Sequence, residues 1–350
     1  MKKLALYAAC AATVLAACSS NEEESVARVM EAESISFGTY VSMNNASRAL
    51  EKSSFATNDV INVNACQTTG ALNGNFTNNF MVNEPLTKVS TGKWTYENSK
   101  FWPLNNTDRI SFVASYPSIA PAIAEGKCKF DFTVNDDANL QQDFMWSTIT
   151  DAHRNDRNGT YQNGIYEEPA TSPITNVVLH FKHALAKVQF NAKAATYYNG
   201  TTITVTDIVV NNLYGAGSYT LTPTLGKGTW AVSGEQTKDY VVLQNGTGNV
   251  IDTYYTSFGT SLLAVPQTLN TTEGTKSTVT IRYTVKYAAP ALTVNEERTF
   301  DLAVTSLLNG DTWEQDKVYN YNFNIALDMI TFDADISGWG SSDSPTFTVE

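Results

Sequence analysis

The chain has 350 residues, of which 42% are hydrophobic and 17% charged, with a formal net charge of -12. A single hydrophobic core rarely grows to this length, so two domains are expected, and the many Tyr, Phe and Thr residues favour an all-β fold. The acidic balance excludes non-specific nucleic-acid binding, because that requires a basic surface that releases phosphate counterions.

The N-terminus has the pattern of a signal peptide. Two lysines precede an apolar stretch from Leu4 to Ala17, which is shorter than the about 20 residues that a membrane-spanning helix needs. The stretch ends in LAAC, which resembles a bacterial lipobox. Cleavage between Ala17 and Cys18 would remove residues 1–17 and leave Cys18 to be acylated. The alternative is a plain secretory peptide that leaves Cys18 as a free thiol.

Residues 18–32 are polar and acidic, which predicts a flexible tether between a lipid anchor and the first domain. The letters SSNEEE in this tether also resemble the acidic export signals that follow the acylated cysteine in surface lipoproteins. No later apolar run is long enough to span a bilayer, so attachment to a membrane would depend on lipid alone.

The first expected strand covers residues 33–41. Ile35, Phe37 and Val41 share one face, which is the period-two pattern of a half-buried strand. The same alternation predicts further strands in the first half of the chain at residues 59–65, 109–117 and 129–134.

The segment after the first strand contains Arg48 and Lys52. These are the only basic residues between Arg28 and Lys88. An ordinary solvated loop explains them, and so does a site at which the chain is cut, because exposed loops are the usual sites of proteolysis.

The run from Asp151 to Pro173 is rich in Asn, Gly and Glu and predicts a long loop with a domain boundary near Ser172. The expected organisation is a signal peptide at 1–17, a lipidated tether at 18–32, an N-terminal β-sandwich at 33–172 and a C-terminal β-sandwich at 173–350 that ends in a strand-like tail.

The second half also reads as strands. Residues 277–287 and 317–327 alternate strictly between apolar and polar side chains. Within residues 177–190 the apolar phase changes between Leu185 and Val188, and we expect a β-bulge near Ala186.

The sequence contains none of the common catalytic or phosphate-binding motifs, and its acidic runs are typical of solvated loops. His180 and His183 would point to opposite faces of a strand, so His183 is expected to be a buried imidazole that is hydrogen-bonded to backbone or a neighbour. Cys66 and Cys128 could form a disulfide or remain two buried thiols. We therefore expect no enzyme, no metal and no cofactor, and tryptophans that pack in the core or at its rim.

Several segments together resemble a known family. Residues 100–118, KFWPLNNTDRISFVASYPS, followed by QQDFMWS, are similar to a motif series of the fimbrillin (Mfa-like) lipoproteins of Bacteroidales-type bacteria, the subunits of type V pili. Further matches are SLLAVPQTL, VTIRYTV, WEQDKVYNYNFNI and ITFDADISGWG, in the family's order. An F-x-H-x-L-A-x-V signature is matched by Phe181, His183, Leu185, Ala186 and Val188.

The resemblance implies two transthyretin-like β-sandwiches in tandem and a structural or adhesive pilus subunit that is exported as an outer-membrane lipoprotein. It also implies that an Arg- or Lys-specific protease cuts between Arg48 and Ala49, or alternatively at Lys52. The strand at 33–41 would then leave with the lipid, and a strand from residues 329–350 of a neighbouring fimbrillin subunit would replace it.

The ligand of such an adhesin would be a host or bacterial surface. A runner-up is a surface lipoprotein that does not polymerise and binds glycan through exposed aromatic residues. A secreted hydrolase is a third class, for which no nucleophile or base constellation was found in the sequence.

Overall fold

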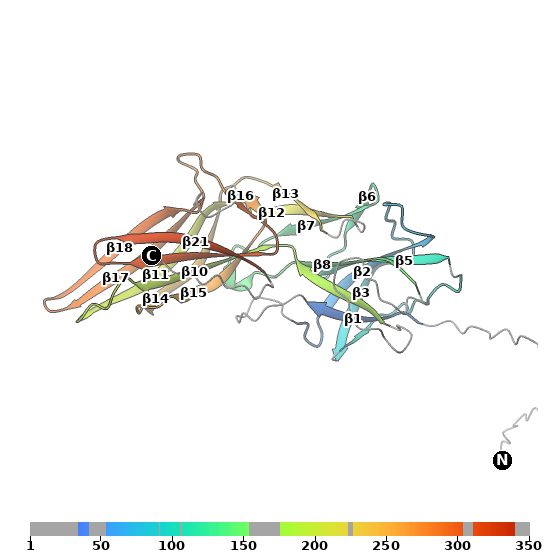
Figure 1. Ribbon diagram of the computed structural model, residues 1–350, viewed down its shortest axis with the longest axis horizontal. Coiled ribbons are helices and arrows are strands. Elements are labelled where there is room, and N and C mark those ends of the chain that lie inside the picture. Colours follow the sequence, from blue (N-terminus) through green and yellow to red (C-terminus); the bar gives the residue numbers. More distant parts are fainter. Residues whose placement is uncertain are drawn as a thin grey trace, which may run out of the picture. The chain divides into compact units, whose positions relative to one another are not determined.

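The computed structural model describes residues 34–41, 54–90, 92–105, 107–153, 176–222, 227–303 and 311–339. Strands dominate these residues, with one short 3₁₀ helix, η1 (Ala138–Leu140), as Figure 1 shows. The expected all-β fold is confirmed. Within the described residues no helix is long and apolar enough to cross a membrane.

A seven-stranded sheet forms most of the first part of the chain. β1 runs parallel to β9, and every other neighbouring pair in this sheet is antiparallel. In spatial order the strands are β1 (Ser36–Val41), β9 (Asn176–His183), β8 (Met145–Ala152), β5 (Asp108–Tyr116), β2 (Val60–Thr69), β3 (Met81–Ser90) and β4 (Lys93–Thr95).

A second sheet covers one face of the first. Trp146 of β8 packs on Tyr219 with ring centroids 6.2 Å apart, and Val113 of β5 lies in the same core as Phe130. The central strand β5 is therefore buried on both faces. The strands of the covering sheet, in spatial order, are β13 (Thr229–Ser233), β12 (Ala216–Leu221), β7 (Lys127–Thr133) and β6 (Ala122–Ala124).

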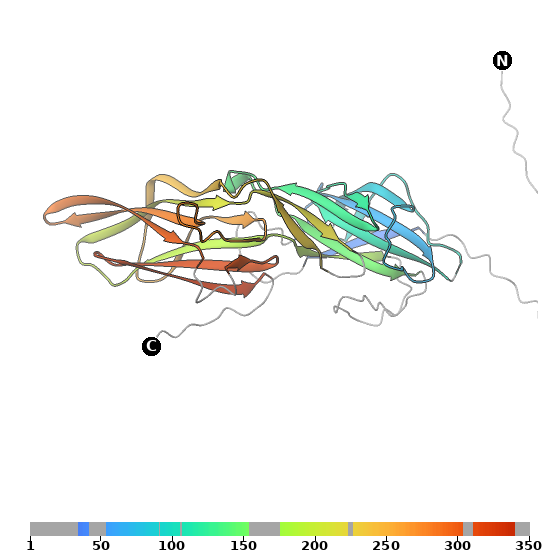
Figure 2. The ribbon, with the colours of Figure 1, turned by 90° about the horizontal axis from the view of Figure 1, so that it is seen from above.

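Two four-stranded sheets form the C-terminal sandwich (Figure 2). One sheet has the order β15 (Thr256–Ala264), β10 (Ala186–Ala194), β20 (Lys317–Ile325) and β21 (Ile330–Gly338). The other has the order β14 (Lys238–Val250), β11 (Thr201–Leu213), β17 (Thr278–Ala288) and β18 (Ala291–Asp301). A short pair is formed by β16 (Gln267–Thr268) and β19 (Thr312–Trp313).

Aromatic side chains fill the space between these two sheets. Tyr321 stacks on Phe332 with centroids 5.5 Å apart, and Phe332 in turn stacks on Phe300 of the opposite sheet at 4.9 Å. The Tyr321 hydroxyl accepts a hydrogen bond from Trp313 Nε1 and donates one to the carbonyl of Leu302. The polar groups of Tyr321 and Trp313 are thus satisfied as well as packed.

The strands expected at residues 33–41, 59–65, 109–117, 129–134, 277–287 and 317–327 are confirmed as β1, β2, β5, β7, β17 and β20. The register of β10 against β15 does shift, but between Val188 and Phe190, and the change of apolar phase at Ala186 has a different cause. The chain leaves one sheet at His183 and enters another at Ala186, with Ala184 N donating to Phe144 O and Leu185 O accepting from Asp316 N. The change of apolar phase marks a change of sheet.

Strand pairing crosses the boundary expected near Ser172. β9 pairs with β1 and β8, and β12 pairs with β7, so strands assigned by the sequence to the C-terminal domain share sheets with strands of the N-terminal half. The polar run at 151–173 signals a long connection, and a long connection can join strands of one sheet as well as two domains.

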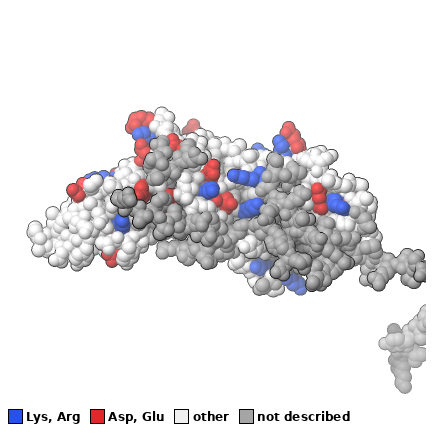
Figure 3. Space-filling model, in the orientation of Figure 1, with Lys and Arg blue, Asp and Glu red and all other residues white. Residues whose placement is uncertain are grey.

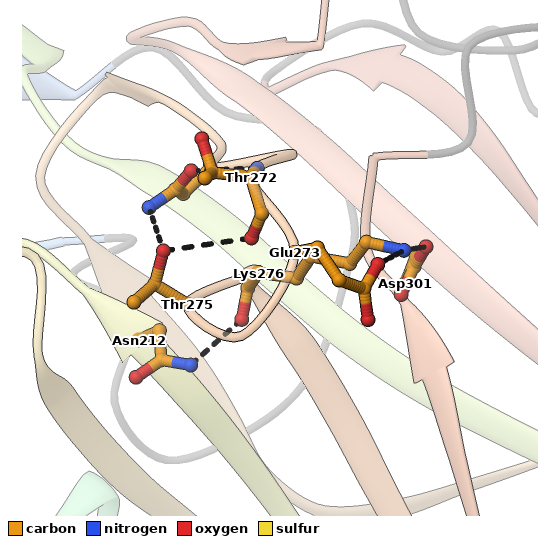
Figure 4. A network of polar contacts seen from close by, with 7 residues as sticks. Asn212, Thr272, Glu273, Thr275, Lys276 and Asp301 are labelled. Atoms are coloured by element: carbon orange, nitrogen blue, oxygen red, sulfur yellow. Dashed lines mark hydrogen bonds and ion pairs between the residues drawn. The ribbon is translucent and has the colours of Figure 1, made fainter.

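A polar network closes the connection between β16 and β17 (Figure 4). Lys276 Nζ lies 3.0 Å from carboxylate oxygens of both Glu273 and Asp301, while Asn212 Nδ2 donates to the Lys276 carbonyl at 2.7 Å. The Thr275 hydroxyl donates to the Thr272 carbonyl. These contacts tie the loop to the ends of β11 and β18.

Candidate functional site

β1 is an edge strand with a fully buried apolar face. Its register with β9 runs from Ser36 opposite Asn176 to Val41 opposite Phe181. Ile35, Phe37 and Val41 are 2%, 1% and 5% exposed. The first strand of the chain is therefore part of a core and not a surface ribbon.

Phe37 is the centre of this packing. Its ring meets Tyr96 and Phe112 edge to face, with centroids 5.6 and 5.7 Å apart. Without β1, the rings of Tyr96 and Phe112 would lose this cover, and β9 would have an unpaired backbone edge. The result would be an apolar groove beside a row of free N–H and C=O groups.

The other edge of β1 is held mainly by side chains. The Tyr96 hydroxyl donates to Ile35 O at 2.7 Å, and Trp94 Nε1 donates to Thr39 Oγ1 at 3.2 Å. One backbone bond joins Ile35 N to Lys100 O at 2.7 Å. β1 thus has one continuous ladder, with β9, and scattered anchors on its second edge.

The outward face of this strand pair carries Tyr40 and His180. Their ring centroids lie 4.9 Å apart, and Tyr40 is 55% exposed. Burial, followed by the charge of Lys182, lowers the pKa of His180. His180 and His183 point to opposite faces of β9, as the sequence predicts.

The expected processing residues lie outside the described residues: Ala17, Cys18, Arg48, Ala49 and Lys52. The structure describes the residues on either side of the segment 42–53. Val41 is buried on one side, and Phe55 is buried on the other against Phe181 and Trp94, with centroids 5.0 and 5.3 Å away. Lys88 Nζ donates a hydrogen bond to the Phe55 carbonyl. Both ends of the segment are therefore firmly anchored.

The C-terminal segment expected to act as a donor divides into two parts. Residues 330–338 form β21, and each of them pairs with β20 from Ile325 opposite Ile330 to Lys317 opposite Gly338. This half is part of the chain's own sheet. Residues 340–350 lie outside the described residues, so only they stay as the predicted donor.

His183, Asp143 and Trp339 meet in a buried cluster that sequence reasoning did not anticipate. The His183 ring stacks on Trp339 with centroids 3.9 Å apart, and His183 Nδ1 lies 2.8 Å from Asp143 Oδ2. The buried, hydrogen-bonded imidazole that the sequence predicts is confirmed. The sequence offered one signal for this cluster, because Asp143, His183 and Trp339 each lie in a different one of the family-like motifs.

Asp316 lies at the edge of this cluster, where its carbonyl accepts a hydrogen bond from Trp339 N at 2.9 Å. Burial raises the pKa of its carboxyl to about 6, against the opposing effect of His183 and of nearby lysines. The position just before the C-terminal tail is therefore fixed by the stacking of Trp339 on His183 and by a backbone hydrogen bond.

Cys66 and Cys128 are free, buried thiols, as in the second of the two alternatives that the sequence leaves open. Burial raises the pKa of the Cys128 thiol to about 12. Most tryptophans are buried, which agrees with the expected core packing. Among the described residues no group of three or more His, Cys, Asp or Glu side chains could hold a metal ion.

Solved structures with the same fold include proteins from three Bacteroides species. A fimbrial protein from Bacteroides vulgatus is similar with a TM-score of 0.55 and 18% identity, over 87% of this chain and 99% of that one. A protein from Bacteroides uniformis, provisionally assigned to cell adhesion, gives 0.51 and 17%, over 88% and 97%. One from Bacteroides ovatus, with the same assignment, gives 0.50 and 15%, over 89% and 99%.

No curated protein matches the chain. At these identities the solved structures show the fold alone. The family model described as fimbrillin-like matches residues 47–339, which is most of the chain. The chain therefore belongs to the fimbrillin-like family, which supports a role as a pilus subunit or a cell-surface adhesin.

Proposed function

We propose that this protein is a structural or adhesive pilus subunit, exported as a lipoprotein and assembled by protease-triggered strand exchange. The observation that carries the proposal is β1. It is an edge strand, it buries Phe37 in a core, and residues 42–59, which include the segment 42–53, join it to β2.

Export would begin with cleavage between Ala17 and Cys18, and an acyl chain on Cys18 would hold the protein at the outer membrane through the tether 18–32. Buried lipid chains of this kind bind a bilayer without a membrane-spanning helix. The proposed location is the cell surface, and then the pilus after assembly.

Assembly would begin with cleavage between Arg48 and Ala49, or alternatively at Lys52, by an Arg- or Lys-specific protease. The cut separates β1 from the rest of the chain, so β1 is then held only by non-covalent contacts. When β1 leaves with the lipid, an apolar groove remains between the backbone edge of β9 and the side chain of Tyr96. An incoming strand restores both the ladder and the apolar cover.

The donor would be residues 340–350 of a neighbouring subunit, where TFTV alternates as a strand should. Eleven extended residues span about 35 Å, and the six residues of β1 span about 20 Å. Residues 340–350 are thus longer than β1 when both are extended.

Limited proteolysis tests this function. Purified lipoprotein treated with an Arg-specific protease should gain a new N-terminus at Ala49 and form oligomers that resist detergent. Arg48→Ala should block trimming at that site, and Arg109→Ala should not, because Arg109 lies within β5.

A variant truncated after Gly340 separates proteolytic trimming from oligomer formation. It should be trimmed normally and form no oligomers, because it lacks the donor and keeps the cleavage site. Oligomers formed by this shortened chain would show that residues 341–350 are not the donor, and cuts at many basic residues would show that the Arg48 segment is not special.

A further inference from the structure

Four loops gather at one end of the C-terminal sandwich (Figures 1 and 2). Ala194 N donates to Asp252 O, Ala195 N to Ile325 O, and Ala288 N to Gly200 O. These bonds join the β10–β11, β14–β15, β17–β18 and β20–β21 connections. Residues that are distant in the sequence therefore share one surface.

Two of these loops carry the same triplet, Thr-Tyr-Tyr, at residues 196–198 and 253–255. The bond from Ala194 to Asp252 is 2.7 Å long, and Ala192 pairs with Thr256, so the two triplets lie on adjacent loops. One tyrosine, Tyr198, packs against the core.

The other three tyrosines point into solvent. Tyr197 is 76% exposed, Tyr254 66% and Tyr255 43%. We call these three residues the tyrosine platform. Single exposed aromatic residues are common, but three on adjacent loops form a surface that the packing of the sandwich does not use.

A polar network lies on the outer face of the adjoining sheet and crosses all four of its strands. Ser257 donates to Asn191 at 2.7 Å, Asn191 to Asn322 at 2.9 Å, and Asn322 to Asp335 at 3.2 Å. Asn320 donates to the other Asp335 oxygen at 2.8 Å. Each amide has two N–H donors and two acceptor lone pairs, so these asparagines keep capacity for an outside ligand.

Tyr255 connects the platform to the network. Lys193 Nζ lies 4.5 Å from the centre of its ring. Burial, followed by the negative charges of Asp333 and Asp335, raises the pKa of the Tyr255 hydroxyl. The ring therefore lies beside Lys193 of β10, the strand that also contributes Asn191 to the network.

The chemistry of this surface indicates which class of ligand it would bind. The sandwich tip that carries the β17–β18 turn is almost entirely uncharged on the face shown in Figure 3. Neutral sugars present apolar C–H faces that stack on exposed aromatic rings, and hydroxyl groups that pair with amides and carboxylates. A polypeptide partner would instead favour a contiguous, fully desolvated apolar centre.

We propose that the tyrosine platform and the adjoining amide network form a binding site for a neutral oligosaccharide. The site does not depend on strand exchange, because every residue in it lies in the C-terminal sandwich. It would give the subunit an adhesive surface in either its lipid-anchored or its assembled state.

Biosensor binding of the purified full chain tests this site. The immobilised probes are a mannan, a galactan and a dextran, with chondroitin sulfate as a charged comparison. At least one neutral probe should bind, and binding to the sulfated probe alone would overturn the proposal. A glycoprotein compared before and after removal of its glycans separates sugar from polypeptide, because equal binding to both forms would also overturn it.

Substitutions test which residues of the tyrosine platform contact the oligosaccharide. Tyr197→Ala with Tyr254→Ala should weaken binding about tenfold or more, because two stacking contacts are lost. The matched control is Phe101→Ala, which removes a 48% exposed ring that bridges to Ser34, outside the C-terminal sandwich, and should leave binding unchanged. Tyr254→Phe keeps the ring and should retain most of the binding.

The single variant Tyr197→Ala serves if the double variant fails to fold, since this ring is the most exposed of the three. Wild-type binding by a folded platform variant, equal weakening by Phe101→Ala, or no binding to any neutral probe would each overturn the proposal.

Discussion

The two edge strands β1 and β21 differ in how they are attached. β1 pairs with β9 in parallel, reaches its next strand through residues 42–59, and has scattered anchors on its second edge. β21 continues directly from β20 in an antiparallel hairpin, and Asp335 accepts side-chain bonds from two residues of that neighbour. β1 buries Phe37 and Val41 almost completely, whereas Ala334 is the one buried residue of β21 and its larger apolar side chains are half-buried, so burial alone would not make β1 the strand that leaves. Under the proposed function, connectivity would make β1 the strand that is exchanged and β21 the one that stays.

The largest expected effect comes from Phe37→Ala. Loss of this buried ring should lower the free energy of unfolding of the untrimmed chain by about 3 to 5 kcal/mol. Chemical denaturation of the chain before and after removal of β1 measures it. The trimmed chain should show no difference between wild type and variant.

Tyr40→Ala is the matched control on the same strand, because Tyr40 is 55% exposed. It should change the free energy of unfolding by about 0.5 kcal/mol or less. An equal loss in both variants would show that the burial of Phe37 is not what stabilises β1 in the untrimmed chain.

The second effect concerns Asp316, whose carbonyl accepts a hydrogen bond from Trp339 just after β21, and it depends on pH. Because the folded pKa of Asp316 is about 6 and its ordinary value is 3.8, the neutral carboxyl favours the folded state. This contribution is complete below about pH 4 and is lost as the pH rises through about 6, with a total of up to about 3 kcal/mol.

Asp316→Asn removes that titration and keeps the backbone bonds to Leu185 and Trp339. The variant should be more stable than wild type at pH 8 and nearly equal at pH 4, as thermal unfolding at the two pH values would show. A variant that is less stable at pH 8 would mean that the ionised carboxyl makes a needed contact.

A smaller effect is expected at the second edge of β1. Tyr96→Phe removes the bond from the hydroxyl to Ile35 O and should cost about 1 kcal/mol. The loosened strand should leave faster after trimming, so oligomers should form sooner in a time course of protease treatment. Unchanged kinetics would imply that β9 alone sets the release of β1.

The smallest effect lies in the loop of Figure 4. Asp301→Asn breaks an exposed ion pair with Lys276 and should change the free energy of unfolding only slightly. Added salt should reduce even this difference, because exposed pairs are screened. A larger, salt-independent loss in thermal unfolding would contradict this view of the loop.

Local alternation was enough to predict which side chains are buried on β1, β17 and β20, because a strand shows its two faces in its sequence. Alternation does not predict a second covering layer. Ser111 and Ser115 of β5 are polar yet buried, since Ser111 Oγ accepts a bond from Asp151 N and Ser115 Oγ donates one to Ile119 O.

Contacts between distant segments also could not be predicted from the sequence. The change of sheet at Ala184 is local, but the partners that cause it, Phe144 and Asp316, are far away in the chain. The stacking of Trp339 on His183 and the meeting of the two Thr-Tyr-Tyr triplets depend in the same way on the complete topology. Sequence periodicity contains no information about such pairs.

Mass spectrometry of protease-treated oligomers tests the exchange of β1 most directly. If β1 is the strand that is replaced, each subunit in the oligomer should begin at Ala49, and the peptide that ends at Arg48 should be absent after washing. Oligomers that retain this peptide in equal amount with the trimmed chain would contradict strand exchange at β1.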